Sequence, residues 1–152
     1  MLLHSSVYGT GAPHNIWLHG FLGHGGNFAS IVKRITGTHY LLDLPNHGNS
    51  YHAKYAKPYE NVSNDVIKFA QLQEGQKFNL IGHSLGGRIA MHAAYLRPDM
   101  INKVVVLDIA PIDSTDTYKH IFTSWKHMLT QLSYLNLQGK TKEEILQAFD
   151  GI

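Results

Sequence analysis

One serine suggests the chemistry of this chain: Ser84, in the stretch Gly82-His83-Ser84-Leu85-Gly86-Gly87. The stretch follows a strand-like apolar run at 78–81 and precedes a helix-like run at 88–96. A serine with glycine two residues before it and two after it, between a strand and a helix, is typical of a nucleophile elbow, a strained turn that exposes the hydroxyl. The N-terminus of the next helix favours negative charge that develops nearby. The stretch therefore predicts a nucleophile and half of an anion-stabilising site.

The elements that must position Ser84 are short apolar runs alternating with helical patterns. Four runs are rich in β-branched or aromatic residues and suit strands buried on both faces: 16–18, 40–42, 78–81 and 104–109. A weaker strand is expected within 2–8. Apolar residues at helical spacing lie between the runs, at 28–35, 62–70 and 89–96. This alternation predicts an α/β fold with a doubly wound, mostly parallel sheet and right-handed crossovers.

The carboxyl ends of the expected strands gather the other chemically active residues. Loops 19–27 and 43–50, the Ser84 turn and a segment that begins at Asp108 all leave these ends. Because ligands of open α/β sheets bind at the carboxyl ends of the strands, we expect all four segments to surround one site.

The pattern changes after Pro111. Apolar residues from Tyr118 to Leu132 form a stripe at helical spacing, and a second helix starts at Thr141 with Glu144 completing a capping box. Since these helices do not continue the strand–helix rhythm, we expect a core at 1–112 and a helical lid or cap at 113–152. The stripe is also explained as the packing face of an ordinary helix.

Three of these segments together resemble the α/β-hydrolase superfamily. They are His19-Gly20-Phe21-Leu22-Gly23, the loop Asp43 to Ser50, and the Ser84 stretch, in this order at successive strand ends. The segment Asp108-Ile109-Ala110-Pro111 looks like a branch of small esterases in which the acid of the triad ends the strand after the nucleophile helix. The resemblance covers about residues 2–135 and implies an incomplete sheet of the α/β-hydrolase type.

The resemblance implies a role for each residue at the strand ends. Ser84 is expected to be the nucleophile and Asp108 the acid of the triad. The backbone N–H groups of Phe21 and Leu85 are expected to form the oxyanion hole. Five residues are expected to line the substrate site: His19, Leu22, His83, Phe122 and Trp125.

Structural alternatives exist for these residues. Ser84 could be a buried serine at an ordinary turn, and Asp108 could only cap the turn that follows it. Asp43 also ends a strand, and we interpret it as a structural residue that holds its loop. His19 and His24 have a spacing that a metal site could use, but no third ligand is evident, and loop 20–26 lacks the glycine spacing of a dinucleotide site. We expect neither a metal nor a cofactor.

Composition narrows the class of protein and its partners. Apolar residues make up 43% and charged residues 16% of the 152 residues, which fits a globular protein. A formal charge of +2 gives no reason to expect nucleic acid as a partner. The chain has no cysteine, no signal-peptide pattern and no apolar run of membrane-spanning length, so we expect an intracellular, cytoplasmic protein.

A catalytic base is missing from the expected triad. In the family that the chain resembles, the histidine follows the lid, whereas no histidine follows His127 here. We therefore expect a chain truncated before its base, with 104–109 left as an apolar edge strand that could self-associate. The expected function is hydrolysis of carboxylic esters or thioesters with apolar acyl groups through an acyl-Ser84 intermediate. The alternative is a non-catalytic module of the same ancestry that binds apolar ligands.

Overall fold

The structure is a computed structural model that describes all residues except 1, 56, 74–76, 112–118, 137 and 150–152. It divides into two compact units, Met1–Pro111 and Ile112–Ile152.

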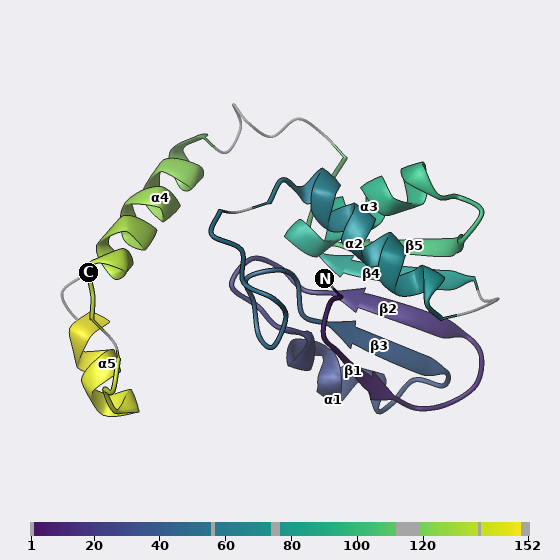
Figure 1. Cartoon of the computed structure of the whole chain (residues 1–152), viewed down its shortest axis with the longest axis horizontal. Coiled ribbons are helices and arrows are strands. Elements are labelled where there is room, and N and C mark those ends of the chain that lie inside the picture. The colour runs from purple at the N-terminus through teal and green to yellow at the C-terminus, as the bar shows by residue number, and fades with distance from the viewer. Residues whose placement is uncertain (1, 56, 74–76, 112–118, 137, 150–152) are drawn as a thin grey trace. The chain divides into compact units, whose positions relative to one another are not determined.

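The first unit is built on a five-stranded sheet (Figure 1). Its strands are β1 (Ser5–Tyr8), β2 (His14–Leu18), β3 (Thr38–Leu42), β4 (Phe78–His83) and β5 (Ile101–Leu107). The order across the sheet is β1-β3-β2-β4-β5. β1 pairs antiparallel with β3, and the other neighbouring pairs are parallel. The predicted α/β fold with a mostly parallel sheet is therefore confirmed.

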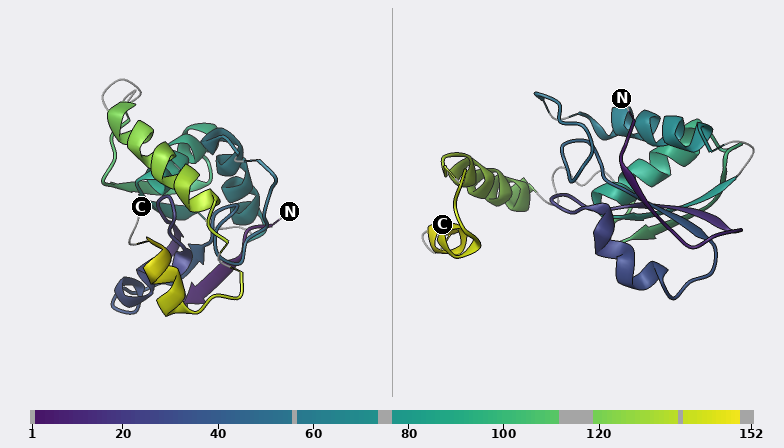
Figure 2. Two further views of the ribbon diagram at one scale, coloured as in Figure 1. Left: turned by 90° about the vertical axis from the view of Figure 1, so that its left-hand side faces the viewer. Right: turned by 60° about the horizontal axis from the view of Figure 1, so that its bottom comes forward.

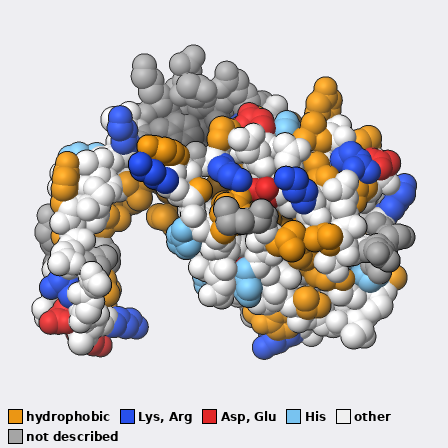
Figure 3. Space-filling model, in the orientation of Figure 1, with side chains coloured by type: hydrophobic (Ala, Val, Ile, Leu, Met, Phe, Trp, Pro, Cys, Tyr) orange, Lys and Arg blue, Asp and Glu red, His pale blue; other side chains and the backbone are white. Residues whose placement is uncertain are grey.

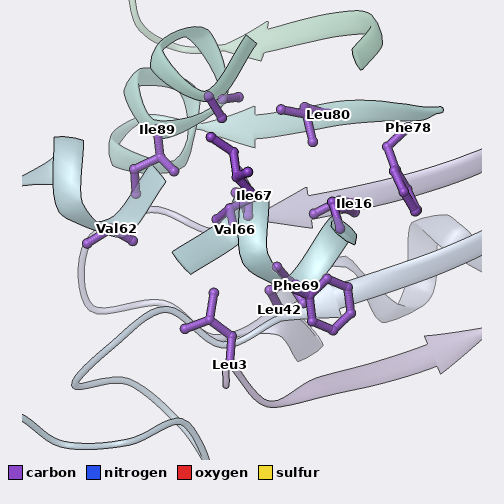
Figure 4. Close-up of a cluster of buried hydrophobic side chains, with 14 of the residues drawn as sticks. Leu3, Ile16, Leu42, Val62, Val66, Ile67, Phe69, Phe78, Leu80 and Ile89 are labelled. Atoms are coloured by element: carbon purple, nitrogen blue, oxygen red, sulfur yellow. The ribbon is translucent and has the colours of Figure 1, made fainter. Parts of the chain in front are cut away.

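Helices cover both faces of this sheet (Figure 2). α2 (Tyr59–Gln71) and α3 (Leu85–Leu96) pack together on one face, and a short 3₁₀ turn, η1 (Gly25–Phe28), continues into α1 (Ala29–Val32) on the other. The side chains of α2 and α3 meet those of the strands in the larger core cluster, which includes Ile16, Leu80 and Ile89 (Figure 4). A smaller cluster on the opposite face joins Trp17 to Phe28 and Val32. Because of this two-sided cover, β2 and β3 are buried except at His14 and Tyr40, which are half-buried.

The helix expected over 28–35 is shorter in the structure than its apolar spacing indicates. α1 ends at Val32, and the next bonds, from Arg34 N–H to Ile31 O and from Ile35 N–H to Val32 O, span only three residues. With one helical turn the spacing cannot place all four apolar residues on one face, so Phe28 and Val32 are buried whereas Ile31 and Ile35 are exposed.

Strand β5 lies at the edge of the sheet formed by the described residues. α3 covers one of its faces, because a Cβ atom added to Gly87 would come within 3.0 Å of a Val106 methyl group. Val105 and Leu107 point to the other face and are 45% and 41% exposed. Figure 3 shows other hydrophobic side chains at the surface of the same unit. The expected apolar edge strand is confirmed for these residues.

The second unit contains two amphipathic helices, α4 (Lys119–Ser133) and α5 (Lys142–Phe149). The predicted capping box at the start of α5 is confirmed, because Thr141 N–H donates to Glu144 Oε2 at 2.7 Å and Glu144 N–H donates to Thr141 Oγ1 at 3.3 Å. No helix among the described residues is both long enough and apolar enough to cross a membrane.

Candidate active site

Ser84 lies in a strained turn between β4 and α3. Its backbone angles, φ 50° and ψ −114°, lie in a region that residues with a side chain rarely adopt. The turn is held on both sides, since Ser84 N–H donates to Leu107 O at 2.9 Å while Ser84 O accepts bonds from Gly87 and Arg88 N–H. The residue is half-buried, so its side chain is not enclosed in the core.

Glycines flank Ser84 because no side chain fits there. A Cβ atom on Gly82 would lie 2.2 Å from Gly86 O, and one on Gly86 would lie 2.1 Å from Leu18 O. These contacts are with backbone atoms, which cannot rotate away. The two glycines therefore let α3 start directly against β4 and β2, which brings Ser84 to the carboxyl end of the sheet.

The loop after β2 lies beside this turn. A Cβ atom on Gly20 would come 3.4 Å from Ser84 Cβ, so the backbone of Gly20 runs next to the candidate nucleophile. Phe21 and Leu22 follow with side chains 41% and 60% exposed. None of the described residues accepts a bond from Leu85 N–H, as expected for the first turn of a helix. Gly20, the residue before Phe21, therefore lies beside Ser84, and Leu85 follows Ser84 at the start of α3.

His19 is buried under the same loop. Its Nδ1 lies 2.7 Å from Gly20 O, and its Nε2 accepts a bond from Leu44 N–H at 3.0 Å. A carbonyl oxygen only accepts, so Nδ1 carries the hydrogen and the ring is neutral. Burial lowers the pKa of His19 from its ordinary value of 6.5. The bond to Leu44 N–H joins loop 19–27 to loop 43–50. His19 is only 1% exposed, so its ring presents no free surface to a ligand.

Asp43 fastens the second loop, as interpreted from the sequence. Its Oδ1 accepts a bond from Gly25 N–H at 2.8 Å, and its Oδ2 accepts one from Asn49 N–H at 2.9 Å and lies 3.0 Å from His4 Nδ1. Burial alone raises the pKa of this carboxyl, but the bonds from Asn49, Gly25 and His4 outweigh it, and the pKa is lowered. The sequence reasoning missed His4, because no spacing relates it to a residue 39 positions away.

Asp108 follows β5 with a left-handed φ of 61°. Its carboxylate is 84% exposed, and Oδ2 lies 3.6 Å from Nε2 of His83. His83 precedes Ser84, and its Nδ1 is close to Gly20. The acid expected in the triad is thus near the turn of Ser84, open to solvent, and in contact with a histidine that the sequence placed at the substrate site.

The two remaining predicted site residues belong to α4. Trp125 is partly exposed in the second unit. Phe122 lies in α4, but its side chain falls outside the described part of the chain. The described residues also contain no group of three or more histidines and carboxylates arranged to hold a metal ion.

Comparisons with known proteins agree with this architecture. Residues 16–141 match a family model described as the alpha/beta hydrolase fold. A solved structure, "Marine microorganism esterase", superposes with a TM-score of 0.88 at 32% identity. The match covers 99% of this chain and 58% of the esterase chain.

Curated relatives include a lipase and an acetyltransferase. An sn-1-specific diacylglycerol lipase ABHD11 of Mus musculus is 38% identical over 107 residues, which is 68% of this chain and 34% of that protein. Ethanol acetyltransferase 1 of Wickerhamomyces anomalus is 32% identical over 132 residues, which is 84% of this chain and 34% of that protein. The chain therefore spans about a third of the length of these relatives.

Proposed function

Because the chain belongs to the α/β-hydrolase family, we propose that Ser84 is the nucleophile of a serine hydrolase acting on carboxylic esters or thioesters. The observation that carries this proposal is the strained backbone of Ser84, with φ 50° and ψ −114°, beside the backbone of Gly20. Strain of this kind persists where the surrounding structure enforces it, and it is common at reacting groups. A simple strand–helix turn does not need it.

The proposed reaction has two acyl-transfer steps. Ser84 Oγ attacks the carbonyl carbon, its proton passes to a base, and the alcohol or thiol leaves with a proton. Water then attacks the acyl-Ser84 ester and releases the acid and the free serine. Backbone N–H groups of Phe21 and Leu85 are proposed to stabilise the oxyanion in both steps, where the loss of one donor costs about 3–4 kcal/mol.

Asp108 is proposed to orient the imidazole base. None of the described histidines forms a hydrogen bond with Ser84 Oγ, and His83 contacts Asp108 rather than the serine. We therefore place the base outside the described residues. Because the chain spans about a third of the length of the curated relatives, activity is to be tested on the protein as its organism makes it.

A serine-directed fluorophosphonate probe tests the nucleophile. We expect mass spectrometry of the labelled full-length protein to place the probe on Ser84, and S84A to abolish the labelling. S30A is the matched control, because Ser30 is an exposed serine of α1 remote in sequence from the turn. Equal labelling of wild type and S84A would eliminate the proposed mechanism.

The exposed side chains of Phe21 and Leu22, which follow Gly20 in the loop beside Ser84, favour an apolar acyl group. Hydrolysis of esters with acyl chains of increasing length is the test, and we expect kcat/KM to rise with chain length.

The expectation that 113–152 forms a lid stays a prediction. If these residues form a lid, W125A should raise KM for esters with long acyl chains and leave KM for short ones unchanged. The ratio of acid to ethyl ester formed in water–ethanol mixtures distinguishes a hydrolase from an acetyltransferase such as the relative of Wickerhamomyces anomalus.

A non-catalytic binding module is the second candidate. The observation that favours it is that none of the described imidazoles is hydrogen-bonded to Ser84 Oγ, since His83 contacts Asp108 instead. Such a module would bind apolar esters without turnover, and S84A would bind them as well as the wild type. Turnover by the full-length protein at an ordinary enzymatic rate, on the order of 10 per second, would exclude it.

A further inference from the structure

Two histidines join the loops of the candidate site in a reciprocal way. His19, in the first loop, accepts a bond from Leu44 N–H in the second. His47, in the second loop, accepts a bond from Leu22 N–H in the first, at 3.1 Å. The two rings meet edge to face with centroids 5.0 Å apart. Each loop thus gives one imidazole and one backbone donor to the other.

The partners of His47 set its hydrogen positions. Nδ1 lies 2.9 Å from Pro45 O, which can only accept, so Nδ1 carries the hydrogen and Nε2 is the acceptor for Leu22. The backbone of His47 is itself fixed, because His47 N–H donates to Leu44 O and His47 O accepts from Ser50 N–H. The position of His47 is therefore fixed within its own loop. Its bond to Leu22 N–H holds the loop after β2 in place.

The supported residue is strained. Leu22 has a φ of 58°, in the left-handed region that disfavours residues with a Cβ atom. A bond from its N–H to His47 offsets this cost and selects the direction of the peptide between Phe21 and Leu22. Leu22 exposes its side chain, so packing of that side chain does little to hold the turn.

The preceding peptide, between Gly20 and Phe21, carries the N–H group that is proposed as an oxyanion donor. Gly20 O accepts bonds from His19 Nδ1 at 2.7 Å and Gly23 N–H at 3.1 Å. In a trans peptide the C=O and N–H groups point in opposite directions, so these bonds also aim the N–H of Phe21. Holding the next peptide, at Leu22, stops the Phe21 backbone from rotating about its own φ and ψ. Both peptides around Phe21 are therefore fixed by imidazoles.

We propose that His47 is a positioning residue of the oxyanion loop, which holds the Phe21 N–H in place by accepting the Leu22 N–H at Nε2. The inference rests on the proposed function, since it needs Phe21 to be an oxyanion donor. His47 does not touch the reacting atoms in this role. Its removal is expected to act on the transition state and not on substrate binding.

Two substitutions separate the two bonds of His47. In H47Q the amide oxygen takes the place of Nε2 and keeps the acceptor for Leu22, while the donor to Pro45 is lost. In H47N the amide nitrogen takes the place of Nδ1 and keeps the donor to Pro45, while the acceptor is lost. We expect H47N to lower kcat of ester hydrolysis by about tenfold to a hundredfold with KM within about twofold, a part of the effect of losing a whole oxyanion donor. We expect H47Q to stay within about threefold of the wild type.

A third readout uses the full-length wild type alone and holds even if H47N fails to fold. Long-range nitrogen-15 NMR should show His47 Nε2 as the unprotonated, accepting nitrogen. A protonated Nε2, a normal kcat in folded H47N, or equal losses in H47Q and H47N would each overturn the inference. If Ser84 is labelled by the probe while H47N is normal, only the inference fails; if Ser84 is not labelled, the proposed function fails.

Discussion

At the scale of single residues, Ser84 shows a conflict between stability and exposure of the hydroxyl. Its φ and ψ angles cost free energy in the folded state, and three hydrogen bonds to backbone atoms keep the turn in place. Glycine adopts such angles without the clash of a Cβ atom. The protein with serine at position 84 is thus expected to be less stable than a variant with glycine there.

Substitution of Ser84 by glycine measures that cost. Both S84A and S84G lack the nucleophile and should not react with the fluorophosphonate probe. S84G should be more stable than S84A by about 1 kcal/mol, because only alanine keeps the strained Cβ atom. Chemical denaturation followed by tryptophan fluorescence is the measurement. A lower stability for S84G would show that the turn is not strained.

His19 is expected to make the folded state sensitive to mild acid. Its pKa is lowered by burial from the ordinary value of 6.5, so below about pH 6.5 the unfolded chain takes up a proton that the folded chain refuses. The free energy of unfolding should therefore fall as the pH drops from 7 to 5. H19Q, which keeps an acceptor for Leu44 N–H, should weaken this pH dependence. A profile of equal slope in H19Q would contradict the assignment.

Asp43 acts in a separate pH range. Its pKa is below the ordinary 3.8, so its contribution to stability is complete above that value and is lost as the pH falls through the lower, folded pKa. Acid unfolding below pH 3.8 therefore reports on the ties between loop 43–50, Gly25 and His4. The contribution of Asp43 to stability does not change between pH 7 and pH 5.

At the scale of elements, α3 and β2 are joined by the closest backbone contact of the site. A Cβ atom on Gly86 would lie 2.1 Å from Leu18 O, whereas one on Gly87 would lie 2.6 Å from a methyl group of Ile109. A carbonyl of a central strand cannot move without the sheet, but a side chain at its edge can rotate. The two glycines are neighbours, and the nearest atom is backbone for Gly86 and side chain for Gly87.

The comparison of G86A with G87A tests how α3 is positioned. We expect G86A to cost about 3 kcal/mol of stability and to abolish labelling of Ser84, because the helix must move away from β2. We expect G87A to cost about 1 kcal/mol and to keep the labelling. Thermal unfolding and probe labelling give the two readouts. Equal effects of the two variants would contradict the close contact.

At the scale of the whole molecule, the open edge of β5 is the feature with the largest consequence. The strand carries Val105 and Leu107 exposed on one face, and the described residues leave its outer backbone groups without a neighbouring strand. An apolar edge of this kind pairs readily with another strand. We propose that two copies of the 152-residue chain associate through β5.

A lysine at the edge should prevent this association. V105K places a charge on the exposed face of β5, and we expect sedimentation velocity to show a shift from dimer to monomer. V7K is the control, since Val7 is an exposed valine on β1 at the opposite edge. A monomeric wild type would contradict association through β5. So would a dimer that V7K dissociates and V105K does not.

The sequence by itself determined the order of strands and helices, the glycine pattern around Ser84 and the capping box at Thr141, because these depend on neighbours within a few residues. It did not determine the end of α1, where four apolar residues at helical spacing gave only one helical turn. The tertiary structure alone decided which imidazole holds which loop. His47 meets Leu22 and His4 meets Asp43 across 25 and 39 positions. The direction of a ring at such a distance depends on how two loops pack, which no local spacing records.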